Sequence, residues 1–582
     1  MSQSFEQSRK GMDPGEKYVP YRERFPLPES FTPTWIRNRP TEAPDLVSVC
    51  LRDGNQTLKN PMSLDAKILY FQKLVDLGFS QIETGYPVAS KIDALFTRYL
   101  IDNPRILQDS GREIKPQVLV LAKPKMIQET LECLQGASPT IVHVYNSTSD
   151  MHRKVLNMTD REVVDMAVKA TTSVRELSHK YRVPVQYQYS PESFSGTQAG
   201  FALDVCNAVI KAWQPTKENK LILNLPATLE QCEPDEYADR IQYICQNILD
   251  RDNVIVSVHT HNDRNSAEVA ASYGVRAGAQ RVEGTLFGFG ERSGNTDLVI
   301  YALNLFTQGI NPWVDFSNIP ALRDFWEERT GLIVPEQHPY AGDNFSKQRS
   351  GTHQDTHEKY VDYREKHGVK VHAHPYLGID LADIGRGDEK VVEVTSQSGW
   401  RGQRSVLNNQ CGVHPPEEMK GEIYPLIQTW CEESGRVCAA ETMMELFQQE
   451  FVNRDGQLKF VDCVTHGNSK ETSVVLTVRV NGNEITVTDT GVGSIDAAVN
   501  ALRKLGQDVT CSKFSEESLG NDSKASAMSY IQLTRGDISR FGVGHDSSSE
   551  LSNVRALISA VNRLIIAEEE AVKQRAAFAL LG

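Results

Sequence analysis

Eight short segments rich in β-branched and aliphatic residues alternate with segments of helical period along the first half of this 582-residue chain. In residues 63–78, Leu64, Ile68, Phe71 and Val75 fall on one stripe, as expected of a helix packed on a sheet. Eight such pairs match the length and rhythm of a (β/α)8 TIM barrel, and favour it over a doubly wound open sheet. The predicted strands are 46–53, 81–85, 117–122, 140–147, 185–190, 221–228, 254–261 and 281–288.

Composition excludes several classes of partner. The chain has 62 Lys and Arg against 76 Asp and Glu, and its net charge of −14 argues against binding to nucleic acid or to an anionic membrane. Ten cysteines without a C-x-x-C spacing indicate reduced thiols. No apolar run approaches the ~18 residues of a membrane span, and the first residues hold no signal-peptide core. We therefore expect a cytoplasmic, multidomain protein.

Two histidines lie two residues apart at the end of the seventh predicted strand. His259 and His261 would point the same way from that strand. An isolated H-x-H is more often two solvated histidines than a metal pair. In a barrel, however, active sites lie at the carboxyl ends of the strands, where Asp53 becomes a natural third ligand. Two imidazoles and a carboxylate form an open, catalytic kind of metal site, so the barrel favours a metal here.

Other polar residues occur near the ends of the remaining predicted strands. Each alone is nearly as well explained as a hydrogen-bonded core residue, and only their joint placement indicates a pocket. The alternative for Arg52 is a structural ion pair with Asp53. The candidates are Arg52, His143, Ser190, Glu192, Asn224 and Thr228.

Six motifs of the chain resemble those of the 2-isopropylmalate synthase family, within the group of metal-dependent aldolase-like barrels. They are "LRDGNQ" (51–56), "HVYNSTS" (143–149), "YSPESFSGT" (189–197), "NLPAT" (224–228), "HTHNDR" (259–264) and "GERSGN" (290–295). Any one alone is weak, whereas six in the same order and spacing are specific. The resemblance runs from about Lys17 to the C-terminus. It implies condensation of acetyl-CoA with 2-oxoisovalerate to 2-isopropylmalate and CoA, the first committed step towards leucine.

The resemblance also implies roles for the candidate residues. A divalent ion, Mg²⁺ or Mn²⁺ with Zn²⁺ as a substitute in crystals, would bind Asp53, His259 and His261 with Asn295 nearby and polarise the carbonyl of the 2-oxo acid. Arg52 would stabilise the developing alkoxide. The 2-oxo acid pocket would be lined by Glu192, His143, Ser190, Asn224 and Thr228.

The base that removes a methyl proton from acetyl-CoA is expected beyond the barrel. The resemblance assigns it to His353 in "SGTHQDTHEK" (350–359), with Tyr376 of "HPYLGID" (374–380) orienting or assisting it. A histidine titrates near the working pH, which suits a general base. From spacing alone, His353 reads as a surface helix residue. His357, one turn further on, is discounted.

Composition divides the chain into four predicted parts. A Pro-rich extension (1–44), expected to be packed or to lie against a partner subunit, precedes the barrel (45–330), and linker subdomains with short helices (331–455) follow it. The last part (456–582) is an α+β domain with a hairpin about Asn481-Gly482, a helix at 495–505 and a long terminal helix. It resembles the family's leucine-binding regulatory domain, with a plain dimerisation module as the alternative. We expect a homodimer with leucine as candidate effector.

Several positions depart from the family pattern. Thr84 and Tyr86 stand in "IETGYP" (82–87) where the family has apolar residues, and Phe289 replaces the usual Asn. "SGWRGQ" (398–403) replaces "SGKGG", and "GVGSID" (491–496) replaces a Gly-Asn-Gly-Pro turn. We expect the Tyr86 hydroxyl to find a protein partner, the pocket to accept an isopropyl group, and leucine inhibition to be weak or absent.

Three other functions stay open. A related alkylmalate or arylmalate synthase would condense acetyl-CoA with another 2-oxo acid. A lyase or carboxyltransferase on the same barrel lacks a metal-ligating lysine or a biotin-type motif. A catalytically silent amino-acid sensor has no physical need for the retained Asp53, His259, His261 and His353.

Overall fold

The computed structural model describes residues 12–13, 15, 17, 38–109, 112–467, 471–520 and 525–581, with side chains of the last helix described to residue 575. Most of the predicted extension at 1–44 therefore lies outside the described residues. The chain forms two compact units. The first comprises residues 1–346 and 369–389, and the second comprises residues 347–368 and 390–582.

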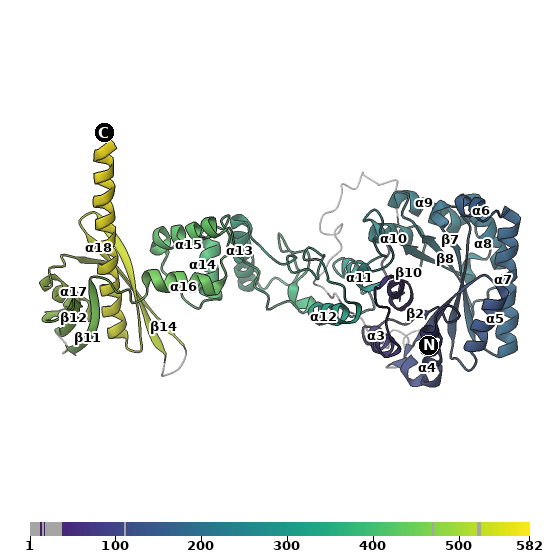
Figure 1. The fold of residues 1–582 in the computed structure, drawn as a ribbon, viewed down its shortest axis with the longest axis horizontal. Coiled ribbons are helices and arrows are strands. Elements are labelled where there is room, and N and C mark those ends of the chain that lie inside the picture. The colour runs from purple at the N-terminus through teal and green to yellow at the C-terminus, as the bar shows by residue number, and fades with distance from the viewer. Residues whose placement is uncertain are drawn as a thin grey trace. The chain divides into compact units, whose positions relative to one another are not determined.

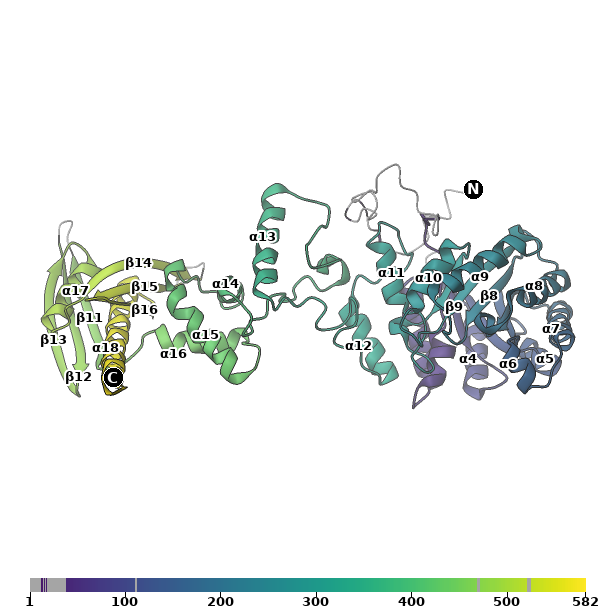
Figure 2. The same ribbon diagram turned by 90° about the horizontal axis from the view of Figure 1, so that it is seen from above.

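The first unit is built on a closed barrel of eight parallel strands surrounded by helices (Figures 1 and 2). The order around the ring is β1-β10-β9-β8-β7-β6-β5-β2, and β1 pairs with both β2 and β10 to close it. The predicted TIM barrel is confirmed, and the open sheet is excluded. The strands are β1 (Asp45–Ser48), β2 (Gln81–Gly85), β5 (Lys115–Leu121), β6 (Thr140–Ser147), β7 (Val185–Glu192), β8 (Leu221–Ala227), β9 (Val254–Thr260) and β10 (Arg281–Gly284).

At least one helix follows each barrel strand. The local sequence marks where these helices begin: the Ser63 side chain caps α3, and Thr159 with Glu162 forms a capping box at α7. A small hairpin of β3 (Gln108–Asp109) and β4 (Arg112–Glu113) precedes β5. At the other end of the barrel region, α12 (Ile319–Thr330) follows α11. The surrounding helices are α3 (Leu64–Asp76), α4 (Lys91–Asp102), α5 (Pro124–Cys133), α6 (Asp150–Val155), α7 (Asp160–Tyr181), α8 (Ala199–Trp213), α9 (Pro234–Asn247), α10 (Ala267–Arg276) and α11 (Leu298–Phe306).

The first strand is shorter than predicted. β1 stops at Ser48, and Cys50–Gly54 form one π-helical turn, η1, in which the Asp53 amide donates to the Val49 carbonyl at 2.9 Å. Arg52 and Asp53 therefore project from a turn after β1 and do not close the strand. Such turns are rare and are frequent at functional sites. Two other strand ends also differ from the prediction: β7 continues past residue 190 to Glu192, and β10 ends at Gly284, four residues before the predicted end.

The second unit begins with a helical region. Gln354 is fully buried and fixes α13, because its amide nitrogen donates to the carbonyls of Gln348 and Glu393 and to the Ser398 hydroxyl. Trp400 on α14 packs in one core with Ile427 and Phe447 of the following helices. The helices are α13 (Gly351–His367), α14 (Trp400–Asn409), α15 (Lys420–Ser434) and α16 (Ala440–Phe451).

The C-terminal domain of the second unit has two three-stranded antiparallel sheets, which confirms the predicted α+β class. The hairpin turns at Asn481 and Gly482, which both have positive φ, as predicted for a tight turn. One core contains side chains from the first sheet and both helices. The elements are β11 (Leu458–Gly467), β12 (Thr472–Val480), β13 (Asn483–Gly491), α17 (Ser494–Lys504), β14 (Thr510–Leu519), β15 (Ser526–Arg535), β16 (Ile538–Asp546) and α18 (Ser549–Leu581).

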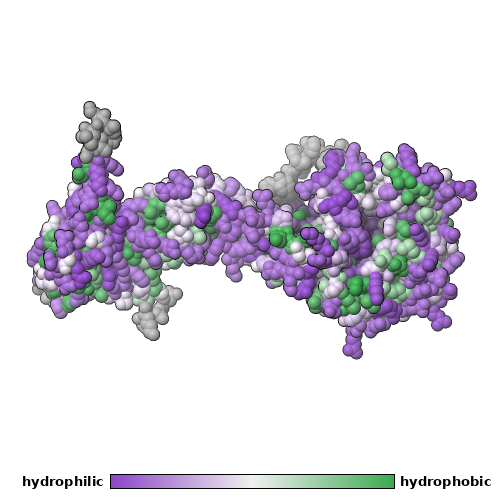
Figure 3. Space-filling model, viewed as in Figure 1, coloured by the Kyte–Doolittle hydropathy of each residue, from purple (hydrophilic) through white to green (hydrophobic). Residues whose placement is uncertain are grey.

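Hydrophilic side chains cover most of the visible face of each unit, and hydrophobic ones gather in small separate groups (Figure 3). Within the described part of the chain, no helix combines the length and the apolar character needed to cross a membrane. All ten cysteines are free, in agreement with the predicted reduced thiols.

Candidate metal centre and active site

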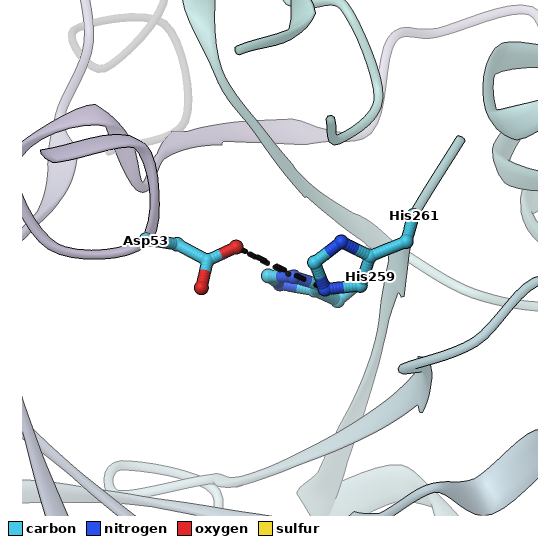
Figure 4. Close-up of side chains that lie close together, drawn as sticks. All are labelled: Asp53, His259 and His261. Carbon is cyan, nitrogen blue, oxygen red and sulfur yellow. Dashed lines mark ion pairs between the residues drawn. The ribbon is translucent and has the colours of Figure 1, made fainter. Parts of the chain in front are cut away.

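Asp53, His259 and His261 come together at the carboxyl ends of β1 and β9. One ligand atom from each lies within 4.8 Å of the others, and no other such group of His, Cys, Asp or Glu occurs among the described residues. Nε2 of His259 lies 3.6 Å, and Nε2 of His261 3.9 Å, from Oδ2 of Asp53. All three residues are buried, and the carboxylate faces both rings (Figure 4).

The second nitrogen of each ring has a protein partner. Nδ1 of His259 lies 2.9 Å from Oε2 of Glu283, and Nδ1 of His261 lies 3.1 Å from the Gly294 carbonyl oxygen. Both partners accept hydrogen bonds, so they place a proton on Nδ1 of each ring. The neutral tautomer then has its lone pair on Nε2, the arrangement typical of metal-binding histidines.

Two buried oxygens at this place have no hydrogen-bond partner. They are Oδ2 of Asp53 and Oδ1 of Asn295, whose backbone pairs with His261. The Asn295 amide nitrogen donates to the Phe289 carbonyl at 3.2 Å, so the oxygen is the end left available. A buried polar atom without a partner is costly. Two imidazoles, a carboxylate and an amide oxygen are donors that suit a divalent cation, so these residues fit a metal.

The three clustered residues and their charged neighbours shift one another's pKa values. Burial alone would raise the pKa of Asp53, but Arg52 and His259 hold that pKa below its usual range. Burial alone would lower the pKa of His259, but hydrogen bonds to Asp53 and Glu283 raise it to about 9. Burial and the neighbouring His259 lower the pKa of His261 to about 4. At neutral pH Asp53 is therefore ionised and His261 neutral, while His259 carries a second proton that a bound metal ion would have to displace.

Arg52 lies between the cluster and a second buried carboxylate. Its Nη1 contacts Oδ1 of Asp53, and its Nε donates to Oε2 of Glu83 at 2.6 Å. Burial would lower the pKa of Arg52, but the two carboxylates raise it, so the guanidinium stays charged. The ion pair with Asp53, the alternative interpretation of Arg52 from the sequence, is thus present, and the catalytic role of Arg52 stays a prediction.

The sequence interpretation missed a charged network inside the barrel. Arg281, which is fully buried, donates to Glu283 at 2.6 Å and to Gln117 at 2.7 Å. Glu83 contacts Nδ1 of His143 at 2.8 Å, as Glu283 contacts His259. The only signal of these residues in the sequence is a charged side chain inside a short predicted strand, QIETG or RVEG, and that signal does not tell whether the charge is buried and paired.

His143, Ser190 and Asn224 form a hydrogen-bonded row. Nε2 of His143 lies 2.7 Å from the Ser190 hydroxyl, which also accepts from the Asn224 amide at 3.0 Å. Oδ1 of Asn224 is buried without a partner. The row thus ends in an acceptor that a bound molecule can satisfy.

Glu192 and Thr228 hold the neighbouring strand ends. Glu192, the last residue of β7, accepts from the Ser147 hydroxyl on β6. The Thr228 hydroxyl accepts from the Ser193 amide at 3.0 Å and ties the end of β8 to the loop after β7. These contacts tie strand ends together and involve none of the metal-ligand residues, so the place of Glu192 and Thr228 in the pocket stays a prediction.

Thr84 and Tyr86, the two departures from the family pattern at the end of β2, have hydroxyl groups that find hydrogen-bond partners within the protein. The Thr84 hydroxyl donates to the Gln117 carbonyl at 3.0 Å, and the Tyr86 hydroxyl accepts from the Leu121 amide at 3.1 Å. The protein partner expected for Tyr86 is therefore confirmed. Neither hydroxyl needs a polar substrate group to offset its burial.

His353 and Tyr376 lie in different units. His353 is half-buried in the first turn of α13, beside Gln354, in the second unit. Tyr376 belongs to the first unit, is 41% exposed, and its amide donates to Nδ1 of His374 at 3.0 Å. The partnership between the two residues stays a prediction.

Three family models match successive parts of the chain: HMGL-like at residues 43–325, alpha-isopropylmalate synthase post-catalytic domain-like at 343–408, and LeuA allosteric (dimerisation) domain at 438–565. The 2-isopropylmalate synthase of Brucella suis is 39% identical over 95% of this chain and 99% of its own length. The chain belongs to the 2-isopropylmalate synthase family.

Other members of the 2-isopropylmalate synthase family match over similar spans. The relative from Rhizobium meliloti is 38% identical over 94% of this chain and 98% of its own, and that from Parafrankia sp. is 39% identical over 94% and 97%. Among solved structures, HMG-CoA lyase of Bacillus subtilis aligns with a TM-score of 0.41 and 19% identity over 52% of this chain and 97% of that one.

Proposed function

We propose that this chain condenses acetyl-CoA with 2-oxoisovalerate and water to give 2-isopropylmalate and CoA, the first step of leucine biosynthesis. The observation that carries the proposal is the buried cluster of Asp53, His259 and His261, with its unpartnered carboxylate oxygen, at the mouth of a barrel of this family. The relatives named 2-isopropylmalate synthase match nearly the whole chain.

Asp53, His259, His261 and Asn295 would hold the divalent ion. Mg²⁺ or Mn²⁺ suits the two oxygen donors and can be replaced in a crystal by Zn²⁺. When bound, such an ion polarises the keto carbonyl of a 2-oxo acid. The Nδ1 contacts of the two histidines support this role, because they orient both rings before any ion binds.

Arg52 would stabilise the negative charge that develops on the keto oxygen as the new C–C bond forms. Its guanidinium is held by Asp53 and Glu83 and is permanently charged. A cation that is already oriented in a water-poor site costs little reorganisation during the reaction.

The row formed by His143, Ser190 and Asn224 would bind the 2-oxo acid, together with Glu192 and Thr228. The unpartnered Oδ1 of Asn224 supports a polar contact from this row. Because the hydroxyls of Thr84 and Tyr86 are already satisfied, an isopropyl-bearing substrate remains our preferred one.

His353 would remove the methyl proton of acetyl-CoA, with Tyr376 as its partner. The resulting carbon nucleophile attacks the keto carbon, the alkoxide takes up a proton, and water cleaves the thioester to release the CoA thiol. An imidazole suits the proton transfer because its pKa lies near the working pH.

The C-terminal domain would form a dimer and respond weakly to leucine. A cavity of about 510 Å³ lies beside the start of α17 and is lined among others by Gly493, Asp496, Phe514 and Asn553. Because "GVGSID" replaces the family's Gly-Asn-Gly-Pro turn next to this cavity, we expect weak or absent inhibition.

Release of the CoA thiol, measured over a panel of 2-oxo acids, tests the proposal. We expect 2-oxoisovalerate to have the highest kcat/KM. A strong preference for arylpyruvates would replace the substrate with an aryl-bearing one, and no thiol release with any 2-oxo acid would reject the condensation. The same assay with millimolar leucine tests regulation, and potent inhibition would contradict the weak response.

A further inference from the structure

We propose that Phe289 is a positioning residue that fixes the η1 turn, with Asp53, relative to Asn295. This inference rests on the proposed metal site, and it assigns a role to a residue that is not itself a metal ligand. Phe289 is buried, with 6% of its surface exposed. Phe289 contacts Gly54, the neighbour of the proposed ligand Asp53, and Asn295, another proposed ligand far from Asp53 in the sequence.

The ring of Phe289 packs directly on Gly54, the residue after Asp53. A Cβ built on Gly54 would lie 2.6 Å from Cε2 of the ring and closer still to Cζ. Gly54 has φ of −63° and ψ of −51°, a conformation that any residue adopts. The glycine is therefore needed for space, and the space it leaves is filled by the Phe289 ring.

The backbone of Phe289 holds the other proposed ligand. Its carbonyl accepts from the Asn295 amide nitrogen at 3.2 Å and from the Thr285 hydroxyl at 2.7 Å. The contact to Asn295 decides which end of the amide is left unpartnered. Movement of residue 289 would therefore shift Asn295 and the η1 turn together.

A rigid aromatic group supports the ring from behind. The rings of Phe289 and Trp326 pack edge-to-face with their centroids 5.6 Å apart. The rings of Trp326 and Phe287 pack in the same way with their centroids 5.1 Å apart. Trp326 is 3% exposed, so the ring of Phe289 is held between Trp326 and Gly54. Shortening the side chain at 289 would leave a gap beside η1, into which the turn can relax.

Mn²⁺ binding to the metal-free full-length chain, measured by titration calorimetry, tests this role without relying on turnover. We expect Phe289→Leu to weaken Mn²⁺ binding by about tenfold to hundredfold, the usual effect of losing a group that orients metal ligands. Phe287→Leu is the matched control, because Phe287 contacts the same tryptophan, whereas the three atoms nearest to a Cβ on Gly54 all belong to Phe289. We expect it to bind Mn²⁺ within about twofold of the unchanged protein.

A double variant gives a second, independent readout. Gly54→Ala alone should also weaken Mn²⁺ binding, because its methyl group collides with the ring. Phe289→Leu removes the ring atoms with which this methyl group collides. The double variant Gly54→Ala with Phe289→Leu should therefore weaken Mn²⁺ binding by less than the product of the two single effects. This pattern is not expected if Phe289 contributes only to the stability of the barrel.

The outcomes separate this inference from the proposed function. If the unchanged chain binds no Mn²⁺, the metal-dependent function fails. If the unchanged chain binds Mn²⁺ and Phe289→Leu binds it equally well, the positioning role is overturned. The role is also overturned if the two single effects multiply in the double variant, or if Phe287→Leu matches Phe289→Leu. Melting temperatures of all variants show whether a loss of binding reflects loss of the fold.

Discussion

The metal-ligand cluster and the predicted acid–base pair are held in very different ways. Asp53, His259 and His261 are buried in one unit, where Glu283 and Gly294 orient the two rings and Arg52 contacts the carboxylate. The half-buried His353 and the 41%-exposed Tyr376 come from two units. The proposed ion site thus draws only on residues of the first unit, whereas the two residues predicted to act on acetyl-CoA belong to different units. Metal binding and proton abstraction should therefore be separable by mutation.

The buried charges of the barrel are better explained by this chemistry than by stability. Burying Arg281, Glu83 and Glu283 costs solvation free energy that a well-packed apolar core would not require. Each carboxylate contacts a histidine of the site or Arg52. We therefore expect the network to lower the stability of the barrel while it fixes the orientation of His143, His259 and Arg52.

The largest effect is expected from loss of a metal ligand. His261→Ala should lose both bound metal and all measurable turnover, because it removes one of three clustered ligands. Metal analysis of the purified variant and thiol release check this. His414→Ala, a surface substitution in the second unit, is the control and should retain both. Normal turnover in His261→Ala would contradict the assignment of the cluster.

The next effect separates the two regions. His353→Ala should lower kcat by roughly 10²–10⁴-fold, the usual contribution of general acid–base catalysis, while Mn²⁺ affinity and binding of the 2-oxo acid stay nearly unchanged. His357→Ala, one turn along α13, is the matched control and should have a small effect. If kcat is unchanged in His353→Ala, the base lies elsewhere, and Tyr376 is the next candidate.

A smaller effect is expected from the residue that orients His259. Glu283→Gln should weaken Mn²⁺ binding by about tenfold to hundredfold. It should also destabilise the barrel by about 3–5 kcal/mol, because Arg281 keeps its buried charge and loses its carboxylate. Titration calorimetry and urea unfolding measure the two effects. An unchanged metal affinity would show that the negative charge of Glu283 behind His259 does not matter for binding.

The smallest effect concerns the pH dependence of stability. Burial, and next the nearby Asp297, raise the pKa of Glu268 to about 7. A raised carboxyl pKa means that the folded chain holds a proton which the unfolded chain has lost. The stability contribution is therefore present below pH 4.5 and is lost as pH rises towards 7. The free energy of unfolding should therefore fall by about 1–3 kcal/mol less between pH 5 and 8 in Glu268→Gln than in the unchanged protein. Urea unfolding at both pH values measures it, and identical pH profiles would contradict the shift.

The fold was largely predictable, because strand–helix alternation is a repeated signal in the sequence. The errors occur where a local conformation has no such signal. The π-helical turn that carries Asp53 looks like a continued strand, since "LVSVCLRD" has the β-branched content of one.

The candidate site was predicted less evenly. Strand ends in a barrel converge, so Asp53, His259 and His261 could be joined from sequence. Glu83, Glu283 and Arg281 could not, because periodicity does not tell which paired charges a barrel interior accepts. The role of Phe289 depends on its packing against Gly54, a contact between residues over 200 positions apart that no local pattern encodes.

Titration of the metal-free chain with Mn²⁺ while CoA release is followed tests the central claim most directly. With acetyl-CoA and 2-oxoisovalerate present, we expect no turnover without metal. Activity should then rise to a plateau at one ion per chain, because the described residues form one clustered ligand set. Full turnover by the metal-free chain in the presence of a chelator would contradict the account.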